Sequence, residues 1–252
     1  MSKSPYLSIV LPVYNEVGLL EDTLRDIQHQ LAETGHSYEV VLVENGSTDG
    51  SVELCARLAS VNNDVRVSNL SWPDYGLALK TGILLARGEY VVNFSADWWD
   101  IPFIDKAISL MNDVDYIIGS KSEDPSADTR SFIRKYGSAV FHHLERLFFP
   151  MPIGDTHGLK VIKSEIIQPV AGICHFGSEV FETELAARSL RAGVRIGEIT
   201  IAIEEIRPGR INILKRGVRA LWHLSGLRCM FWLEDLGIIK RPMSGARAGE
   251  QA

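Results

Sequence analysis

An aromatic ring and a carboxylate follow the first apolar run of the chain. Residues 7–13 have the apolar, β-branched character of a buried strand, and Pro12, Tyr14 and Glu16 stand at its end. At the rim of a sheet, such a ring can stack on a nucleobase and such a carboxylate can accept hydrogen bonds from a ribose. The alternative interpretation is the end of a strand followed by the cap of a helix.

Two further strand ends carry polar side chains. Residues 38–43 form an expected strand that is followed by Glu44 and Asn45, where the amide is placed to read the edge of a base. Residues 89–94 form another, and the sequence Ser-Ala-Asp-Trp-Trp-Asp follows at 95–100. Because open α/β sheets bind ligands at the carboxyl ends of their strands, these side chains are predicted to line one site.

Short β-branched runs alternate with segments of helical periodicity, which is the pattern of a layered α/β sheet. The length of 252 residues fits one catalytic domain at 1–210, a helical appendage at 211–240 and a disordered tail at 241–252. Further strands are expected at 65–67, 116–118 and 195–203, and helices at 16–33, 76–87, 102–111, 131–149 and 180–192. One more helix reaches residue 58 from an N-cap at Ser47, Thr48 or Asp49.

Composition excludes several classes of protein. The net charge of −6, from 26 basic and 32 acidic residues, lacks the basic excess of a nucleic-acid-binding protein. The three cysteines show no C-x-x-C spacing, so neither a disulfide framework nor a zinc site is expected. With no signal peptide and no apolar run of about 18 residues, we expect a cytoplasmic protein without a transmembrane helix.

Three segments resemble family 2 glycosyltransferases. Residues 7–16, LSIVLPVYNE, are similar to the family's V-P-x-Y-N-E, and 43–50, VENGSTDG, to its D-D-G-S-x-D-G. Residues 88–97, GEYVVNFSAD, stand where the family has G-E-Y-x-x-x-x-D-A-D. Downstream, 154–160 and 181–185 resemble the D-T-x-x-G-F-K and F-D-x-E-L segments of polyprenyl-phosphate glycosyltransferases of the dolichyl-phosphate mannose synthase type. The resemblance extends over roughly residues 6 to 210.

The resemblance implies a GT-A-like, Rossmann-like fold with a mostly parallel sheet. It also implies inverting transfer of a sugar from a nucleotide donor to a polyprenyl phosphate, with Asp97 as a ligand of Mg²⁺ or Mn²⁺. The nucleotide-binding residues that it implies are Pro12, Tyr14, Glu16, Glu44, Asn45, Ser95 and Ala96.

The chain departs from the family pattern at two places. Ser95 replaces the first aspartate of the D-x-D motif, which weakens the expected metal site, because a divalent ion must then be held by one carboxylate together with substrate phosphates. Asp100 either assists the metal or caps the helix that begins before Pro102. Asn45 stands where the family has an acceptor-only carboxylate, and an amide both donates and accepts hydrogen bonds, so uracil or another base is favoured over guanine.

On the acceptor side, the resemblance implies catalytic roles for Asp155, Lys160 and Arg207. The basic residues predicted to hold the acceptor phosphate are Lys121, Arg130, Arg134 and Arg210. For each basic residue, the alternative is a solvated surface charge. His157 is either a proton carrier or a structural residue.

The appendage at 211–239 is predicted to be a basic amphipathic helix. Leu214, Val218, Leu221 and Ser225 share one face, and Lys215, Arg216, Arg219 and His223 cluster opposite. Such a helix either lies in a membrane interface, which makes the protein peripheral to the cytoplasmic face of the membrane, or docks on the catalytic domain or a second subunit.

Two functional alternatives remain open. In the first, the sugar passes to a hydroxyl of a glycan or small molecule, which requires Asp155 or a neighbouring carboxylate as a base. In the second, the protein binds a nucleotide sugar and has lost catalysis. The sequence also leaves open whether the chain forms a homo-oligomer.

Overall fold

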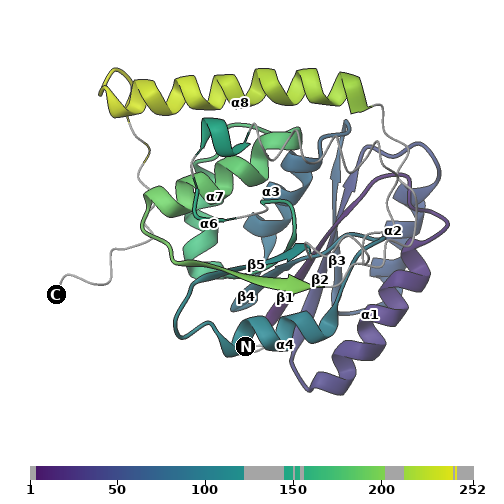
Figure 1. Cartoon of the computed structure of the whole chain (residues 1–252). Helices are drawn as coiled ribbons and strands as arrows, with labels where there is room; N and C mark the ends of the chain where they lie inside the picture. Colours follow the sequence, from purple (N-terminus) through teal and green to yellow (C-terminus); the bar gives the residue numbers. More distant parts are fainter. Residues whose placement is uncertain are drawn as a thin grey trace.

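The computed structural model describes residues 4–121, 145–149, 151–153, 156–201, 213–240 and 242. One seven-stranded sheet runs through this part of the chain in the order β3-β2-β1-β4-β6-β5-β7 (Figure 1). β6 runs antiparallel to both of its neighbours, whereas the other strands are parallel to one another. The strands are β1 (Leu7–Val13), β2 (Tyr38–Asn45), β3 (Val65–Leu70), β4 (Tyr90–Asn93), β5 (Tyr116–Lys121), β6 (Leu159–Lys163) and β7 (Ile196–Ile201).

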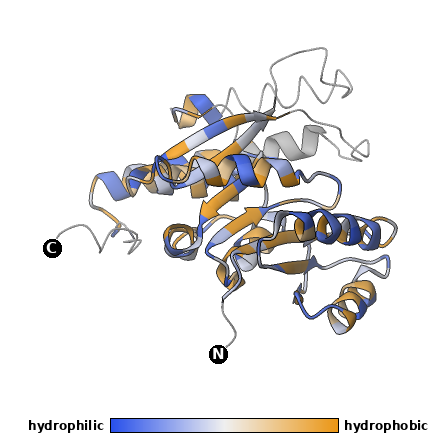
Figure 2. Cartoon of the chain, turned by 90° about the horizontal axis from the view of Figure 1, so that it is seen from below, coloured by the Kyte–Doolittle hydropathy of each residue, from blue (hydrophilic) through white to orange (hydrophobic). Residues whose placement is uncertain are grey.

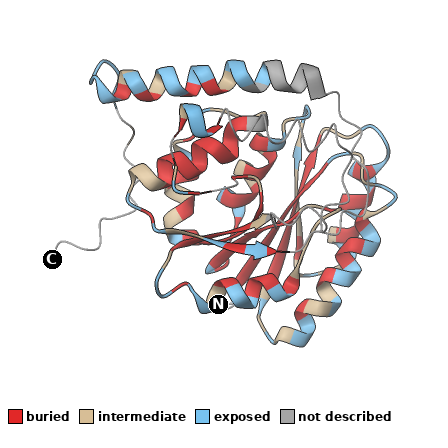
Figure 3. Ribbon diagram, viewed as in Figure 1, coloured by how far each residue is buried: buried red, intermediate tan, exposed pale blue. Residues whose placement is uncertain are grey.

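Helices cover both faces of the sheet, so that two apolar cores form. One core joins α1, α2 and α4 to the sheet, and the other joins α3, α6 and α7 to its opposite face. Buried residues fill the sheet in Figure 3, and hydrophobic residues are concentrated in its strands in Figure 2. The helices are α1 (Leu20–Thr34), α2 (Ser51–Val61), α3 (Tyr75–Leu85), α4 (Ile101–Ser109), α6 (Ser164–Gly172), α7 (Phe181–Arg191) and α8 (Ile213–Asp235), with a 3₁₀ turn η1 (Ser178–Val180) before α7.

The mostly parallel α/β sheet confirms the fold class predicted from the sequence, but local details differ from the prediction. α1 begins at Leu20 rather than at 16, because 16–19 form a turn in which the amides of Leu19 and Leu20 both donate to the carbonyl of Glu16. Gly50 stands at the N-cap position of α2 in the left-handed conformation, with φ of 95°, and Asp49 Oδ1 accepts the amide of Ser51, the first residue of the helix, at 3.0 Å. β6 and α6 were not expected. Most of the predicted helix at 131–149 lies outside the described residues, although 145–148 are helical.

α8 docks on the catalytic domain, which confirms one of the two alternatives for the appendage. Leu224, Leu227 and Phe231 are buried and form a third core with residues that include Phe149 and Val180. Leu221 and Ser225, which were predicted to share the apolar face, are exposed, so the docked residues belong to another stripe of the helix. The side chains of Leu214, Lys215, Arg216 and Val218 lie outside the described residues.

Ion pairs connect α8 to α7. Arg188 donates to Glu184 at 2.7 Å and to Glu234 at 3.1 Å, and its guanidinium lies 5.0 Å from the centre of the Phe231 ring. Arg188, Glu184 and Glu234 are all buried, and Arg191 lies 3.6 Å from Glu234, so two cations face two carboxylates at the interface. α8 is therefore an integral part of the described fold.

Asp115 joins three strand ends through its carboxylate. It accepts hydrogen bonds from Lys163 at the end of β6 at 2.8 Å, and from Arg195 before β7 at 2.9 and 3.0 Å. Burial alone raises the pKa of Asp115, but the hydrogen bonds from Arg195 and Lys163 outweigh burial and hold that pKa well below its usual range. The ionised carboxylate of Asp115 therefore stabilises the place where β5, β6 and β7 meet.

We expect Asp115→Asn to lower the free energy of unfolding at pH 7 by about 1–3 kcal/mol, because two cations lose their buried partner. The folded-state pKa is lowered, so this stabilisation is present above the unfolded pKa of about 4 and is lost as the pH falls below it. Urea denaturation should therefore show a gap between wild type and variant that shrinks from pH 7 to pH 3. Asp113→Asn, at an exposed site, is the control and should change stability by less than about 0.5 kcal/mol. A gap of equal size at both pH values would contradict the assignment.

Candidate active site

The carboxyl ends of β1 and β4 flank a topological switch point. From β1 the chain continues to β2 and β3 on one side of the sheet, whereas β4 pairs with β1 on the other side. Crevices outside such points are where open α/β sheets bind ligands. Tyr14 and Glu16 follow β1 and the segment 95–97 follows β4, so the structure brings together the strand ends that the sequence identified.

The segment after β2 holds the turn after β1 in place. Asn15 adopts a positive φ of 56°. Its backbone amide donates to Ser47 Oγ at 3.0 Å, and its side-chain Oδ1 accepts from the backbone amide of Thr48 at 2.8 Å. The amide of Glu16 donates to Ser51 Oγ at 2.9 Å. Tyr14 is 46% exposed as a result of this geometry. These contacts join the motifs at 7–16 and 43–50, and neither motif predicts them by itself.

Glu44 and Asn45 are buried at the tip of β2. Glu44 accepts the amides of Gly46 at 3.2 Å and Ser47 at 2.6 Å, so its carboxylate shapes the turn. Asn45 Oδ1 accepts the amide of Asp74 at 2.7 Å. Glu44 therefore holds the turn that follows β2, and Asn45 holds the loop that precedes α3. No observation tests their predicted contact with a base, which stays a prediction. Pro12, in β1, is buried as well.

A tight turn presents Asp97 at the end of β4. Backbone hydrogen bonds of 3.0 and 3.3 Å close the turn between Ser95 and Trp98, and Thr23 of α1 donates to the carbonyl of Ala96 at 2.8 Å. Ser95 Oγ donates to Asp97 Oδ1 at 2.8 Å. The serine that replaces an aspartate therefore orients the remaining carboxylate and leaves its Oδ2 without a hydrogen bond from the described residues.

The residues at this turn fit a divalent metal held by one carboxylate. Within the described ranges, no three His, Cys, Asp or Glu side chains are grouped as a metal site. Asp100 caps α4 by accepting the amide of Phe103 at 3.0 Å, which confirms the capping alternative. Asp97 with substrate phosphates and water is the remaining ligand set, and Mg²⁺ accepts such a set.

Lys160 is buried behind the site instead of facing solvent. It pairs with Asn93 in the register of β6 and β4, and its ammonium group donates to Glu182 of α7 and to the carbonyl of Gly158 at 2.7 Å. Asn93 Oδ1 is buried without a partner in the described structure. The positive charge of Lys160 is therefore neutralised by Glu182 inside the protein.

His157 lies between two buried carboxylates. Its Nδ1 is 2.9 Å from Thr156 Oγ1 and its Nε2 is 3.7 Å from Glu182. Glu145, which accepts from Thr156 at 2.7 Å, is on the other side of the ring. His157 is 28% exposed, so it is the part of this cluster that can meet a ligand.

Several predicted residues lie outside the described structure. They are Arg130, Arg134, Asp155, Arg207 and Arg210, together with the side chain of Lys121.

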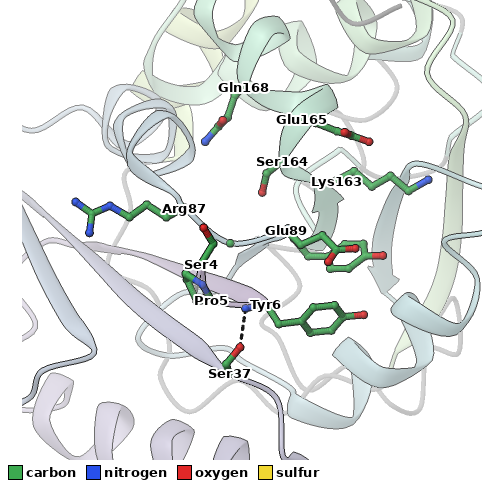
Figure 4. A pocket seen from close by; sticks show the side chains of 12 residues that line it. Ser4, Pro5, Tyr6, Ser37, Arg87, Glu89, Lys163, Ser164, Glu165 and Gln168 are labelled. Atoms are coloured by element: carbon green, nitrogen blue, oxygen red, sulfur yellow. Dashed lines mark hydrogen bonds between the residues drawn. The ribbon is translucent and has the colours of Figure 1, made fainter. Parts of the chain in front are cut away.

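A hollow of about 840 Å³ lies at the opposite edge of the sheet, at the amino ends of β1 and β4 (Figure 4). Tyr6, Arg87 and Lys163 line it, and in Figure 4 the charged groups of Arg87 and Lys163 point away from one another. Neither the Asp97 turn nor the Asn45 tip contributes to it. The hollow is thus separate from the candidate site.

Comparison with known proteins is consistent with this site. The model of the family described as "Glycosyl transferase family 2" matches residues 8–164. Dolichyl-phosphate β-glucosyltransferases from Dictyostelium discoideum and Saccharomyces cerevisiae are 23% and 27% identical to the chain, over 90% of this chain and 75% of each relative.

Among solved structures, a similar one is glucosyl-3-phosphoglycerate synthase from Mycobacterium tuberculosis in complex with Mn²⁺, UDP-glucose and phosphoglyceric acid. The TM-score is 0.67 at 17% identity, over 90% of this chain and 80% of that one. The likeness shows that the chain has a GT-A fold.

We expect Asp97→Asn to weaken binding of Mn²⁺ in the presence of UDP by at least about tenfold, because the substitution removes the carboxylate charge from the turn. Isothermal titration calorimetry measures this affinity directly. Asp100→Asn is the matched control, because asparagine caps a helix as well as aspartate does. The affinity of this variant for Mn²⁺ should match that of the wild-type protein. Equal losses in both variants would show that Asp97 is not the principal ligand.

Proposed function

Because the chain belongs to glycosyl transferase family 2, we propose that it transfers a sugar from a nucleoside diphosphate sugar to the phosphate of a polyprenyl phosphate, with inversion at the anomeric carbon. The observation that carries the proposal is the turn from Ser95 to Trp98, which holds Asp97 at the switch point while its Oδ2 accepts no hydrogen bond from the described residues. The names of the Dictyostelium and yeast relatives support the lipid-phosphate acceptor.

In the proposed reaction, an oxygen of the acceptor phosphate attacks the anomeric carbon while the bond from that carbon to the donor diphosphate breaks. The products are the sugar linked to polyprenyl phosphate and a nucleoside diphosphate. A phosphate monoester is already anionic near neutral pH, so Asp155 need not act as a strong base. We assign the acceptor phosphate to Lys121, Arg130, Arg134, Arg207 and Arg210.

The donor diphosphate belongs at Asp97. A divalent ion, Mg²⁺ or Mn²⁺, would neutralise the charge that develops on the departing diphosphate. Ser95 orients the carboxylate that holds this ion, and Thr23 holds the turn through the carbonyl of Ala96. The Mn²⁺ and UDP-glucose in the mycobacterial structure support this arrangement and make UDP-glucose the first donor to test.

Lys160 acts indirectly in this proposal. Its ammonium group holds Glu182, and Glu182 in turn faces the ring of His157 at 3.7 Å. Lys160 is thus a positioning residue for the acceptor side of the site.

Incubation with radiolabelled UDP-glucose, Mn²⁺ and polyprenyl phosphate in detergent tests the proposal. We expect label in the organic phase after solvent extraction, and at least about a hundredfold less product from Asp97→Asn, since the substitution removes about 3 kcal/mol of stabilisation from the diphosphate. Asp100→Asn serves as the folded control.

Label that appears only in a water-soluble product would eliminate the lipid acceptor in favour of a hydroxyl acceptor. Binding of UDP-glucose without transfer to either acceptor would identify a nucleotide-sugar-binding protein that has lost catalysis.

We propose in addition that the exposed face of α8 makes peripheral contact with a membrane, at its cytoplasmic face. Leu221, Trp222 and Trp232 are exposed by 40%, 79% and 56%, whereas the docked residues of the helix are buried. Tryptophan is enriched where proteins meet the bilayer interface. None of the described helices is long and apolar enough to cross a bilayer.

The position of α8 fits a lipid acceptor. α8 packs against η1, and Ser178 of η1 donates to Asp74 beside the carboxyl end of β3 at 2.6 Å. In Figure 1, α8 extends along one side of the molecule, over α6 and α7. Membrane contact through α8 would hold this edge of the sheet near a lipid carrier.

Cys229 is exposed on the outward face of α8 and offers a specific label. Burial raises the pKa of both Cys55 and Cys174, which keeps these thiols unreactive. We expect the fluorescence emission of an environment-sensitive dye on Cys229 to shift to shorter wavelength when anionic vesicles are added. We also expect the double variant Trp222→Ser with Trp232→Ser to lose flotation with these vesicles. Trp72→Ser, at an exposed tryptophan outside α8, is the control. Flotation that survives the double substitution would refute membrane contact through this face.

A further inference from the structure

Trp72 is an exposed aromatic residue on a short loop between β3 and α3. Its exposed fraction is 62%, although the loop lies at the carboxyl edge of the sheet, where the candidate site is. Single exposed hydrophobic residues are common on protein surfaces. Exposure of Trp72 therefore becomes informative only together with the way the loop is held.

Both ends of this loop are anchored to the tip of β2. Gly46 has a φ of 69°, and a Cβ on it would lie 2.9 Å from the backbone of Trp72, so the two backbones are in direct contact. The amide of Asp74 donates to Asn45 Oδ1 at 2.7 Å. Between these anchors, Pro73 restricts the backbone further.

The carboxylate of Asp74 ties the same loop to two helical segments. Asp74 Oδ1 accepts the amide of Leu77 in α3 at 2.9 Å and that of Ser178 in η1 at 2.6 Å. The loop thus has little freedom to fold its tryptophan inward. Trp72, whose large aromatic side chain is exposed, therefore stands on a backbone that is restrained on both sides.

The order of the strands gives the distance between Asp97 and Trp72 along the edge of the sheet. From β4, which carries Asp97, the order runs through β1 and β2 to β3, which precedes Trp72. Three strand spacings correspond to about 14 Å. An extended nucleoside diphosphate with its diphosphate at Asp97 can bridge this span and bring its base to the end of β2. Tyr14 and Trp72 flank that end.

We infer that Trp72 is a stacking platform for the base of the donor nucleotide. The inference rests on the proposed function only in taking the donor to be a nucleoside diphosphate sugar. An aromatic ring stacks on any base, so Trp72 contributes affinity, and discrimination between bases depends on hydrogen-bonding groups such as those at Asn45. The anchors at Gly46 and Asn45 serve to place the ring.

Calorimetric titration with UDP, GDP and pyrophosphate, in the presence of Mn²⁺ and without lipid, tests the inference. Stacking contributes about 1–3 kcal/mol per base, so Trp72→Ala should raise the Kd of a bound nucleoside diphosphate by about 5- to 150-fold. The Kd of pyrophosphate should stay within about twofold of wild type, because it has no base. Trp72→Phe should recover most of the affinity, and Trp222→Ala on α8 is the matched control for loss of an exposed tryptophan.

Three outcomes would overturn the inference. An unchanged Kd for UDP and GDP in Trp72→Ala would remove the stacking role, and loss of vesicle flotation in the same variant would instead make Trp72 a membrane contact. Equal losses for UDP and pyrophosphate would place its effect at the diphosphate.

Failure of the proposed function is distinguishable from failure of the inference. A wild-type protein that binds no nucleoside diphosphate refutes both. A protein that binds UDP through Trp72 and forms no lipid product refutes only the lipid acceptor.

Discussion

The candidate site depends on the hydrogen bonds that join the turn after β1 to the turn after β2. Asn15 exchanges hydrogen bonds with Ser47 and Thr48, and Ser51 accepts the amide of Glu16. A strand end in an open sheet has unpaired backbone amides that must find partners. Because these partners come from the neighbouring strand end, the two turns form a single surface whose shape is set by side chains on both.

Buried charges organise the other half of the molecule. Lys160 is buried with Glu182, and Arg188 is buried with Glu184 and Glu234. Arg191 supplies a second cation to Glu234. A lone charge in these positions would be severely destabilising, whereas paired charges fix which helix packs against which. α7 carries one partner of both sets and therefore connects the back of the site to α8.

The motifs near residues 7–16, 43–50 and 88–97 allowed the fold and the nucleotide-binding edge to be predicted. Strand ends at the same edge of a parallel sheet must meet, so Tyr14, Asn45 and Asp97 could be placed together before the structure was known. The supporting contacts could not be predicted. Thr23 and Ala96 are separated by 73 residues, and Asp74 and Ser178 by 104, so no local pattern connects them.

Hydrophobic period and turn chemistry are local properties, so the alternation of strands and helices, the α/β class and the segments that line the site could be predicted from the residues alone. The remaining features depend on contacts between distant parts of the chain. β6 was not predicted because it contains Lys160, and a lysine is not expected in a buried strand. The carboxylate of Glu182 in α7 pairs with this lysine and makes its burial possible. The docked face of α8 could not be assigned, since the helix has apolar residues on more than one side, and only packing against Phe149 and Val180 selects the stripe at Leu224, Leu227 and Phe231.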